Sequence, residues 1–285
     1  MMNRVPTRPV IRYYGGKWRL ADWVIEHFPK HRCYVEGFGG AGSVLMKKKP
    51  ARVEIYNDLN QEIVNLFKVL RDKESSSELR RLLDLTPYSR DEFLACYELS
   101  ELPIEQARRT VVLAMQAHNP AKSLDRKANG WRSSTAGHHI ITRDFKEHTK
   151  ALELITDRLK GVIIENHPAQ KICEQHDRPD TLHYLDPPYP GATRSSKGKY
   201  YKHELRGMDA HKELFDWANK LTGMVILSGY QCQEYEDWYG RAGWEKRTKT
   251  AQTGAFCGGA KTAKATEMLW LNPLVSAMQR QQRLF

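Results

Sequence analysis

The chain has 285 residues, of which 40% are hydrophobic and 28% charged, and 45 Lys and Arg against 34 Asp and Glu give a net charge of +11. This length and apolar fraction exclude a chain that is disordered throughout, and they fit one large domain or two modest ones. The longest uncharged apolar stretches are too short to span a bilayer, and no apolar segment follows the first residues, so we expect neither a membrane span nor a secretory signal.

Short β-rich runs alternate with longer helical ones along the first quarter of the chain. Residues 34–36 are predicted to form a strand that ends in a cluster of glycines, and a helix is expected from Gly42 onward. Residues 53–56 form the next predicted strand. Residues 60–70 then carry apolar side chains at helical spacing, namely Ile63, Val64, Phe67 and Leu70. This order of strand, helix and strand predicts a parallel α/β sheet.

The pattern changes near Lys73. Residues 77–116 and 144–159 are predicted to be helical, with an irregular polar stretch between them, and strands resume at residues 162–165, 181–185, 224–228 and 267–271. We therefore predict an α/β domain that consists of residues 1–72 and 160–273. A mainly helical insertion, residues 73–159, interrupts this domain, and a loose polar tail, residues 274–285, follows it.

A cluster of glycines follows the first predicted strand. The segment Gly37-Phe38-Gly39-Gly40-Ala41-Gly42 contains the pattern G-x-G-x-x-G, and Asp58 lies 21 residues after Gly37, at the end of the second strand. Glycines let a ligand approach the backbone, and an acid at the second strand accepts hydrogen bonds from ribose hydroxyls. The spacing predicts a cofactor that contains a nucleoside. NAD, FAD and S-adenosylmethionine all fit, and an ordinary glycine turn is the plainer alternative.

The segment Asp186-Pro187-Pro188-Tyr189 follows the predicted strand 181–185, at the edge where ligands bind in open α/β sheets. Its two prolines stiffen the backbone and remove two N–H donors. The Asp186 carboxylate and the Pro187 carbonyl can accept both N–H bonds of an exocyclic amino group, while Tyr189 stacks on the base. A base in a duplex must first be flipped out. The alternative is a proline-rich strand end without chemistry.

Four motifs in this order resemble those of a known family over nearly the whole chain. They are Tyr13-Tyr14-Gly15-Gly16-Lys17, then residues 36–43 from Glu36 to Ser43, then Asn57-Asp58, and finally the Asp-Pro-Pro-Tyr segment. The chain resembles the Dam-like, D12-class (alpha-group) DNA N6-adenine methyltransferases of bacteria and phages. The resemblance implies a class I S-adenosylmethionine-dependent methyltransferase fold, which is a Rossmann-like mixed sheet with helices on both faces. It makes the α/β domain catalytic and the insertion a target-recognition domain.

The resemblance also implies which residues hold S-adenosylmethionine. The matching positions are Tyr13, Lys17, Phe38, Gly40, Gly42 and Ser43 around the cofactor, Asp58 at its ribose, and Asp186 between the cofactor and the reacting base. The chain departs from the family pattern twice. Tyr13 stands where the family usually has Trp, and Asn166 stands near the place of an acid that often contacts the adenine of the cofactor. Glu36 is a candidate for orienting the methionine amino group.

Basic residues gather in three islands, residues 118–150, 190–212 and 241–264, whose net charges are +4, +4 and +5, while the rest of the chain is close to neutral. Such islands predict contact with a polyanion, and solvated lysine-rich loops are the alternative. We expect the first two islands to supply the DNA contacts Arg126, Lys127, Asn129, Trp131, Arg132, Arg194, Lys197, Lys199 and Tyr201. The third island is expected to be a loop between the last two strands that contacts phosphate.

Two further features bear on partners and compartment. Five scattered cysteines show no metal-ligand spacing, which indicates a reducing cytoplasm, in a bacterial cell or a phage-infected host, and no metal site. The terminal segment from Gln281 to Phe285 resembles the Gln-x-x-Leu-Phe peptides that dock on bacterial sliding clamps, although such pentapeptides arise easily by chance.

Together these features predict a site-specific DNA methyltransferase that transfers the methyl group of S-adenosylmethionine to N6 of a flipped-out adenine in double-stranded DNA. N4-cytosine methylation is the nearest alternative, because the amino group of cytosine has the same chemistry. A dinucleotide-dependent oxidoreductase would explain the glycines but leave the basic islands without a role. A non-catalytic DNA-binding protein would explain the charge but leave the cofactor pocket without one.

Overall fold

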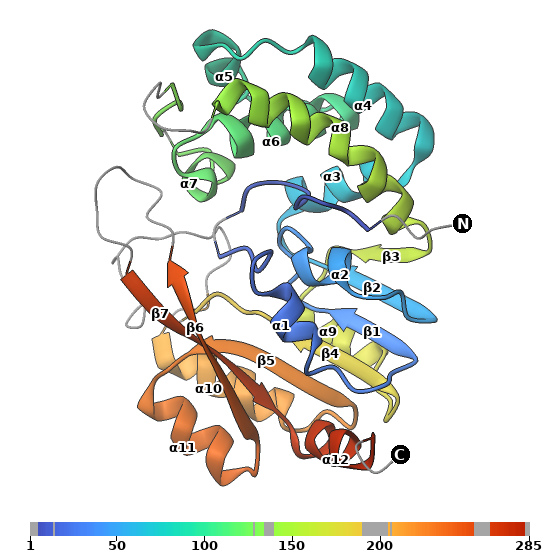
Figure 1. Cartoon of the computed structure of the whole chain (residues 1–285), viewed down its shortest axis with the longest axis vertical. Coiled ribbons are helices and arrows are strands. Elements are labelled where there is room, and N and C mark those ends of the chain that lie inside the picture. The colour runs from blue at the N-terminus through green and yellow to red at the C-terminus, as the bar shows by residue number, and fades with distance from the viewer. Residues whose placement is uncertain are drawn as a thin grey trace.

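The computed structural model describes residues 5–13, 15–127, 129–133, 140–189, 205, 207–253 and 263–282. At its centre is a seven-stranded sheet with the strand order β3-β2-β1-β4-β5-β7-β6 (Figure 1). The strands are β1 (Cys33–Glu36), β2 (Val53–Asn57), β3 (Val162–Glu165), β4 (Thr181–Leu185), β5 (Met224–Tyr230), β6 (Glu245–Thr253) and β7 (Ala263–Leu271). The first five are parallel to one another, whereas β7 is antiparallel to both of its neighbours, β5 and β6.

The order of the strands reverses beside β1. The chain runs from β1 to β2 on one side, and it later returns to place β4 on the other side, with Glu36 of β1 opposite both Tyr56 and Tyr184. In open parallel sheets a ligand binds outside the carboxyl ends of the strands at such a switch point. The segments that follow β1, β2 and β4 therefore meet at one edge of the sheet.

Each face of the sheet carries its own apolar core, because successive side chains of a strand point to opposite faces. On one face Tyr34 packs among residues of α1 (Ala21–Ile25), α2 (Ser43–Lys47) and α12 (Pro273–Gln282). On the other face Val35 packs among residues of α9 (Ala169–Gln175), α10 (Gly207–Ala218) and α11 (Gln233–Arg241). The sheet is thus mixed and covered by helices on both faces, as the sequence predicts.

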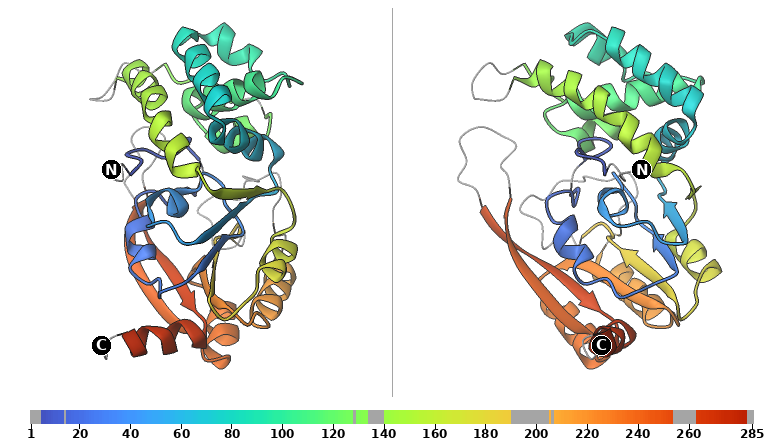
Figure 2. Two further views of the ribbon diagram at one scale, coloured as in Figure 1. Left: turned by 90° about the vertical axis from the view of Figure 1, so that its right-hand side faces the viewer. Right: turned by 45° about the vertical axis from the view of Figure 1, so that its right-hand side comes forward.

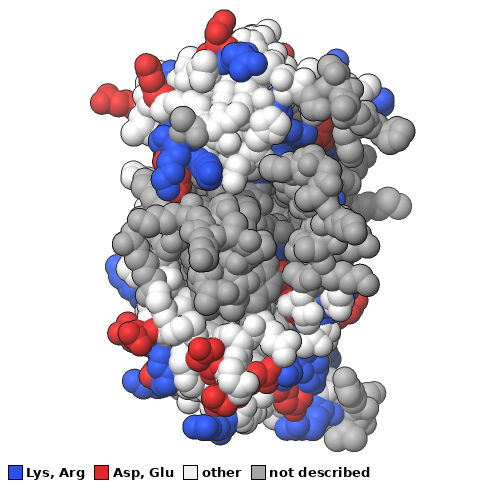
Figure 3. All heavy atoms as spheres, turned by 90° about the vertical axis from the view of Figure 1, so that its left-hand side faces the viewer, with Lys and Arg blue, Asp and Glu red and all other residues white. Residues whose placement is uncertain are grey.

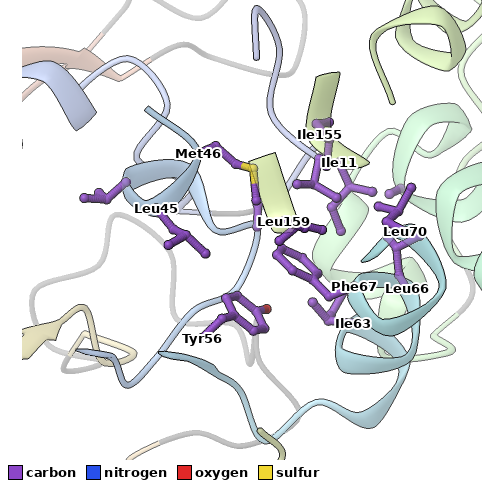
Figure 4. Close-up of a cluster of buried hydrophobic side chains, with 14 of the residues drawn as sticks. Ile11, Leu45, Met46, Tyr56, Ile63, Leu66, Phe67, Leu70, Ile155 and Leu159 are labelled. Atoms are coloured by element: carbon purple, nitrogen blue, oxygen red, sulfur yellow. The ribbon is translucent and has the colours of Figure 1, made fainter. Parts of the chain in front are cut away.

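A helical lobe lies above the sheet along the long axis of the molecule (Figures 1 and 2). It consists of α4 (Lys73–Leu85), α5 (Arg90–Ala95), α6 (Pro103–Gln116), α7 (Pro120–Leu124) and α8 (Ile141–Leu159), and α3 (Gln61–Arg71) joins it to the sheet. Side chains of α2, α3 and α8 meet in a single apolar cluster with Phe67 and Leu159 near its middle (Figure 4). The lobe therefore shares a core with the sheet, and no loose linker separates them.

A buried ion network also fastens the helical lobe to the sheet. Glu54 of β2 lies between Lys48, at 2.5 Å, and Arg158 of α8, whose two terminal nitrogens lie 2.6 and 2.9 Å from its carboxylate. The side chains of Lys48 and Arg158 are only 2% and 8% exposed. Because buried charges are costly unless they are paired, this carboxylate holds the end of α8 against β2.

Two expectations from the sequence were wrong at the C-terminal side. Most of the expected loose tail is helix α12, which begins with Pro273 after Asn272 and places Val275 in the core. Gln279 of this helix donates a hydrogen bond to the carbonyl of His27. The third basic island is also partly strand, since β6 pairs with β7 along its whole length and forms a long ribbon that runs toward the helical lobe (Figure 2). Its glycine-rich residues 254–260 lie outside the described residues.

No helix in the described part of the chain combines the length and the apolar character that a membrane crossing requires.

We expect Glu54→Ala to lower the free energy of unfolding by about 3–5 kcal/mol, because it leaves two cations buried without a counter-charge. Urea denaturation of the two proteins measures this loss. The control is Glu78→Ala, which removes an exposed ion pair with Arg81 in α4 and should leave the urea midpoint nearly unchanged. Equal midpoints for all three proteins would show that the buried network contributes nothing.

Candidate active site

The glycine loop after β1 has a backbone that other residues rarely adopt. Gly40 and Gly42 have φ angles of +48° and +61°, in the left-handed region that favours glycine. Gly42 directly precedes α2, so first-turn N–H groups of this helix point back toward the loop. A Cβ atom added to Gly39 would lie 2.2 Å from Cε2 of Tyr56. Glycine at this position therefore makes room for the Tyr56 ring, which packs directly against the loop.

Asp58 ties the end of β2 to this loop. Its Oδ2 accepts a hydrogen bond from the backbone N–H of Gly40 at 2.8 Å, and its Oδ1 accepts one from Asn60 at 2.7 Å. Asn166, which follows β3, donates from its side chain to the carbonyl of Asp58 at 2.7 Å. The structure thus brings together Gly40, Asp58 and Asn166, three of the residues that the sequence assigns to the cofactor.

Asn57 is a residue whose role the sequence analysis missed. Its side-chain amide donates to the carbonyls of Gly37 and His167, both at 2.9 Å, and its Oδ1 accepts from the N–H of His167. It thereby holds together the chain ends that follow β1 and β3. Its place beside Asp58 in the motif was visible, but its partners depend on the order of the strands in the sheet.

Glu36 ends β1 and is almost completely buried, with 2% of its surface exposed. Its Oε2 accepts hydrogen bonds from the hydroxyl of Tyr34 at 2.7 Å and from the N–H of Leu45 in the first turn of α2 at 2.9 Å. Burial outweighs these hydrogen bonds and raises the pKa of Glu36 to about 8. At neutral pH this side chain is therefore a neutral acid that caps α2.

Lys17 brings the N-terminal motif to the end of β4. Its side chain is 6% exposed, and its Nζ lies 3.0 Å from Oδ1 of Asp186 and 3.2 Å from the carbonyl of Gly15. The same ammonium group lies 4.7 Å from the centre of the Tyr189 ring. Isolated in the sequence, Lys17 would pass for a solvated lysine. In the fold it is a buried cation shared by the carboxylate and the aromatic ring of the Asp-Pro-Pro-Tyr segment.

The hydroxyl of Tyr189 lies among three polar side chains, two of which no sequence motif indicated. It is 3.1 Å from Oδ1 of Asp186, 3.2 Å from Oγ of Ser228 on β5, and 3.3 Å from Oε2 of Glu267 on β7. Burial, aided by the charge of Asp186, raises the pKa of Tyr189 well above its ordinary value, so it stays a hydrogen-bond donor. Ser228 and Glu267 meet only because β7 is inserted antiparallel beside β5, an arrangement that no local pattern revealed.

The remaining cofactor candidates lie around the same loop. The ring of Tyr13 packs against Gly40, at 3.0 Å from the position that a Cβ atom would take there. Phe38 is half-buried against the core on the opposite face of the sheet. The hydroxyl of Ser43, at the start of α2, is buried and has no hydrogen-bond partner among the described residues. Pro187 is buried and Pro188 is half-buried beside Asp186.

The DNA-contact candidates of the insertion mostly bind other parts of the protein. Two of them form ion pairs, Arg126 with Glu62 and Lys127 with Asp125. The side chains of Asn129 and Arg132 donate to the backbone carbonyls of Asn119 and Met115, respectively. The indole of Trp131 donates to the side chain of Gln116. On the face shown in Figure 3 the described Lys and Arg side chains stand among Asp and Glu. The candidates Arg194, Lys197, Lys199 and Tyr201 lie outside the described residues.

The described His, Cys, Asp and Glu side chains form no group of three or more that could hold a metal ion. The geometry instead brings the glycine loop and Asp58 to the same edge of the sheet as a carboxylate, a proline turn and an aromatic ring. That combination is typical of an enzyme that modifies the amino group of a planar base.

Comparison with known proteins identifies the class. Residues 13–253 match the family model of the D12 class N6 adenine-specific DNA methyltransferases, and the chain belongs to this family. The mixed sheet is accordingly a class I S-adenosylmethionine-dependent methyltransferase fold, as the sequence predicts. Because the family is adenine-specific, the N4-cytosine alternative is not supported, and neither are the oxidoreductase and the non-catalytic DNA-binding protein.

Named relatives agree with this assignment. The chain is 23% identical to the DNA adenine methylase of Serratia marcescens over 249 residues, which cover 82% of this chain and 88% of that protein. It is 38% identical to the DNA adenine methylase of Haemophilus influenzae over 65 residues, and 36% identical to that of Escherichia coli K12 over 64 residues. These two shorter matches span only 22% and 23% of the relatives' own lengths.

We expect Gly39→Ala to destabilise the protein by about 1–3 kcal/mol and to weaken cofactor binding, because the added methyl overlaps the Tyr56 ring. That ring is stacked on Phe67, with 4.0 Å between the centroids, and bonded to the carbonyl of Gly40, so it cannot yield. Thermal melts and cofactor titration measure the two effects. The matched control is Gly240→Ala in α11, where nothing lies within 4 Å of the new methyl and no loss is expected. A Gly39→Ala protein as stable as this control would contradict the clash.

Glu36→Gln is expected to change how stability depends on pH. A carboxyl whose pKa is raised from 4.5 to about 8 contributes stability that is complete below pH 4.5 and is lost as the pH rises through 8. The wild-type protein should therefore lose stability over this range. The neutral glutamine should lose less, so that the variant is the more stable protein at pH 9. Urea denaturation of both proteins at pH 5, 7 and 9 gives the free energy of unfolding at each pH. The same change of this free energy with pH in both proteins would show that Glu36 ionises normally.

Proposed function

We propose that this chain transfers the methyl group of S-adenosylmethionine to N6 of an adenine that is flipped out of double-stranded DNA at a specific sequence. The observation that carries the proposal is the contact of Lys17 with both Asp186 and Tyr189, next to the glycine loop at the switch point of the sheet. The family to which the chain belongs supports adenine N6 as the acceptor.

The residues around the glycine loop fit S-adenosylmethionine. The positive φ angles of Gly40 and Gly42 fix the course of the loop, and the buried hydroxyl of Ser43, which has no partner among the described residues, can bond to the cofactor. In this proposal Asp58 accepts from the ribose, Asn166 lies near the adenine, and Glu36 faces the methionine amino group, with Tyr13 and Phe38 beside the loop. When bound, the cofactor would supply a methyl group on a positively charged sulfonium, and S-adenosylhomocysteine would leave as a neutral thioether.

The Asp-Pro-Pro-Tyr segment acts on the amino group of the base. Lys17 and the Tyr189 hydroxyl both engage Oδ1 of Asp186, which leaves Oδ2 to accept one N–H of the adenine amino group. The carbonyl of Pro187 accepts the other N–H. These two hydrogen bonds localise the nitrogen lone pair and strengthen as positive charge develops on N6. The bond between N6 and the methyl carbon would form as the bond between that carbon and sulfur breaks. Asp186 would then take the proton that N6 releases, while Tyr189 stacks on the ring.

Contact with DNA rests on the basic islands. We propose that Lys127 and Arg132 in the insertion, together with Arg194, Lys197, Lys199 and Tyr201 after the catalytic segment, face the duplex. Electrostatic contacts of this kind fasten the protein to phosphate, whereas base edges supply the sequence information. The enzyme would act where its DNA is, in the cytoplasm of a bacterial cell or a phage-infected host.

Docking on a sliding clamp through residues 281–285 remains a separate prediction. Neither the comparisons nor the described residues support it, since helix α12 takes up the first two residues of the segment and the last three lie outside the described part.

Asp186→Ala is expected to lower the rate of methylation by a factor of about 100 or more, because the amino group loses its hydrogen-bond acceptor and the pocket loses the partner of Lys17. Mass spectrometry of hydrolysed plasmid measures N6-methyladenine, and it also detects N4-methylcytosine. Gel-shift titration should show that DNA binding survives. The control Asp157→Ala removes an exposed pair with Lys160 and should methylate normally. Unimpaired methylation in the Asp186→Ala protein would falsify the assignment.

A further inference from the structure

We propose that Arg126 is a positioning residue that governs sequence discrimination without touching DNA. It fastens the recognition segment, defined here as residues 126, 127 and 129–132, to the start of α3, beside the loop that carries Asp58. This inference rests on the proposed function, since it concerns how the same enzyme holds its DNA-reading segment, and it replaces the expectation that Arg126 contacts a base.

The guanidinium of Arg126 is engaged on three sides by the protein. Its Nη2 lies 2.5 Å from Oε2 of Glu62, and its Nε lies 3.3 Å from Oε1 of the same carboxylate, which is a two-pronged ion pair. Its Nη1 donates to the carbonyl of Cys96 at 2.5 Å and also lies 3.3 Å from that of Glu98. Glu62 is 9% exposed and also accepts a hydrogen bond from Gln106. To read a base, Arg126 would have to leave this carboxylate buried and without its cation, which is costly.

The backbone of Arg126 is also unusual. Its φ angle of +58° makes it the one non-glycine residue in the left-handed region within the described part of the chain. For a residue with a side chain this conformation costs roughly 1–2 kcal/mol, and it persists where the surroundings determine it strongly. The ion pair with Glu62 supplies such a constraint. Together the turn at Arg126 and its side chain set the direction in which the chain leaves α7.

The rest of the recognition segment is held from its other end. The N–H of Arg132 and the indole N–H of Trp131 both bond to Gln116 at the end of α6, while the side chain of Asn129 donates to the carbonyl of Asn119. The Lys127 side chain, by contrast, is 49% exposed. The segment is thus a short loop clamped at both ends, and the clamp at Arg126 is the one that reaches outside the surrounding helices to α3.

The position of Glu62 links this clamp to the cofactor loop. The side chain of Asn60 accepts a hydrogen bond from the N–H of Glu62 at 3.1 Å, and the N–H of Asn60 donates to Asp58. Asp58 in turn accepts from the N–H of Gly40. An unbroken series of hydrogen bonds therefore runs from the glycine loop to Arg126, so that the recognition segment is placed relative to the methyl-transfer site.

The test is a double-mutant cycle of Glu62→Gln, Arg126→Gln and the double variant. The recognition sequence is first read by sequencing plasmid methylated in expressing cells, and kcat/KM is then compared between this site and sites with one changed base. Each single variant should lower the discrimination ratio by about tenfold or more. The double variant should be no worse than either single one, because all three lose the same contact.

Salt dependence separates positioning from DNA contact. Log affinity falls linearly with log salt. The steepness of this fall should be unchanged by Arg126→Gln, whereas loss of a phosphate contact makes it shallower by about one. A shallower salt dependence of Arg126→Gln would overturn the proposal. So would normal discrimination in Glu62→Gln together with poor discrimination in Arg126→Gln. Lys127→Gln is the matched control from the same segment. It should make the salt dependence shallower while keeping the discrimination ratio.

Two further comparisons guard against a trivial result. Arg126→Lys keeps the charge but not the two-pronged pairing, so it should regain part of the discrimination if the contact with Glu62 is what matters. Arg108→Gln breaks two other ion pairs in the same lobe, with Glu92 and Glu105, and should alter thermal stability without altering discrimination. A wild-type protein that makes no N6-methyladenine would contradict the proposed function itself. In that case the preferred site is found by selecting bound duplexes from a random pool, and the same cycle, measured as relative binding affinity for that site and for sites with one changed base, still decides the role of Arg126.

Discussion

The ion pair between Lys17 and Asp186 is the interaction on which the site depends. Its 3.0 Å contact joins a segment near the N-terminus to the end of β4, across most of the length of the chain. Neither group is well placed to remain charged away from water by itself, so each justifies the burial of the other. The Tyr189 ring shares the same ammonium, and its hydroxyl meets the same carboxylate oxygen. One contact thus orients the acid, the aromatic ring and the proline turn between them.

The parallel part of the sheet makes this contact possible. Because the carboxyl ends of β1, β2 and β4 lie at one edge, the glycine loop, Asp58 and the Asp-Pro-Pro-Tyr segment become neighbours although they are far apart in the sequence. The helical lobe is tied to the α/β domain twice, by Glu54 near the start of β2 and by Glu62 near the start of α3. Each of these ion pairs joins a carboxylate of the α/β domain to an arginine of the lobe. Together they fix the position of the lobe relative to the sheet.

Much of the fold could be predicted because its signals are local. The strands near residues 34, 53, 162 and 181, the helix that follows Asn60, and the helical insertion all show their period directly in the sequence, and the structure has them. Strand β6 was missed because its alternation consists of charged and small polar residues, among them Lys246, Arg247 and Lys249. Helix α12 was missed because only Val275 and Ser276 are buried in it, and its polar surface looks like that of a loose end.

By itself, the sequence determined the chemistry and the family. Both are indicated by short motifs, namely the glycine loop, Asp58 and the Asp-Pro-Pro-Tyr segment, whose residues carry their chemistry in their own side chains or backbone. Only the tertiary structure decided which groups support them. Ser228 and Glu267 reach Tyr189 through an antiparallel insertion, Lys17 reaches Asp186 across the molecule, and Arg126 turns inward to Glu62. A motif records what a residue can do, whereas its partners depend on strand order and burial, and these arise only when the whole chain packs.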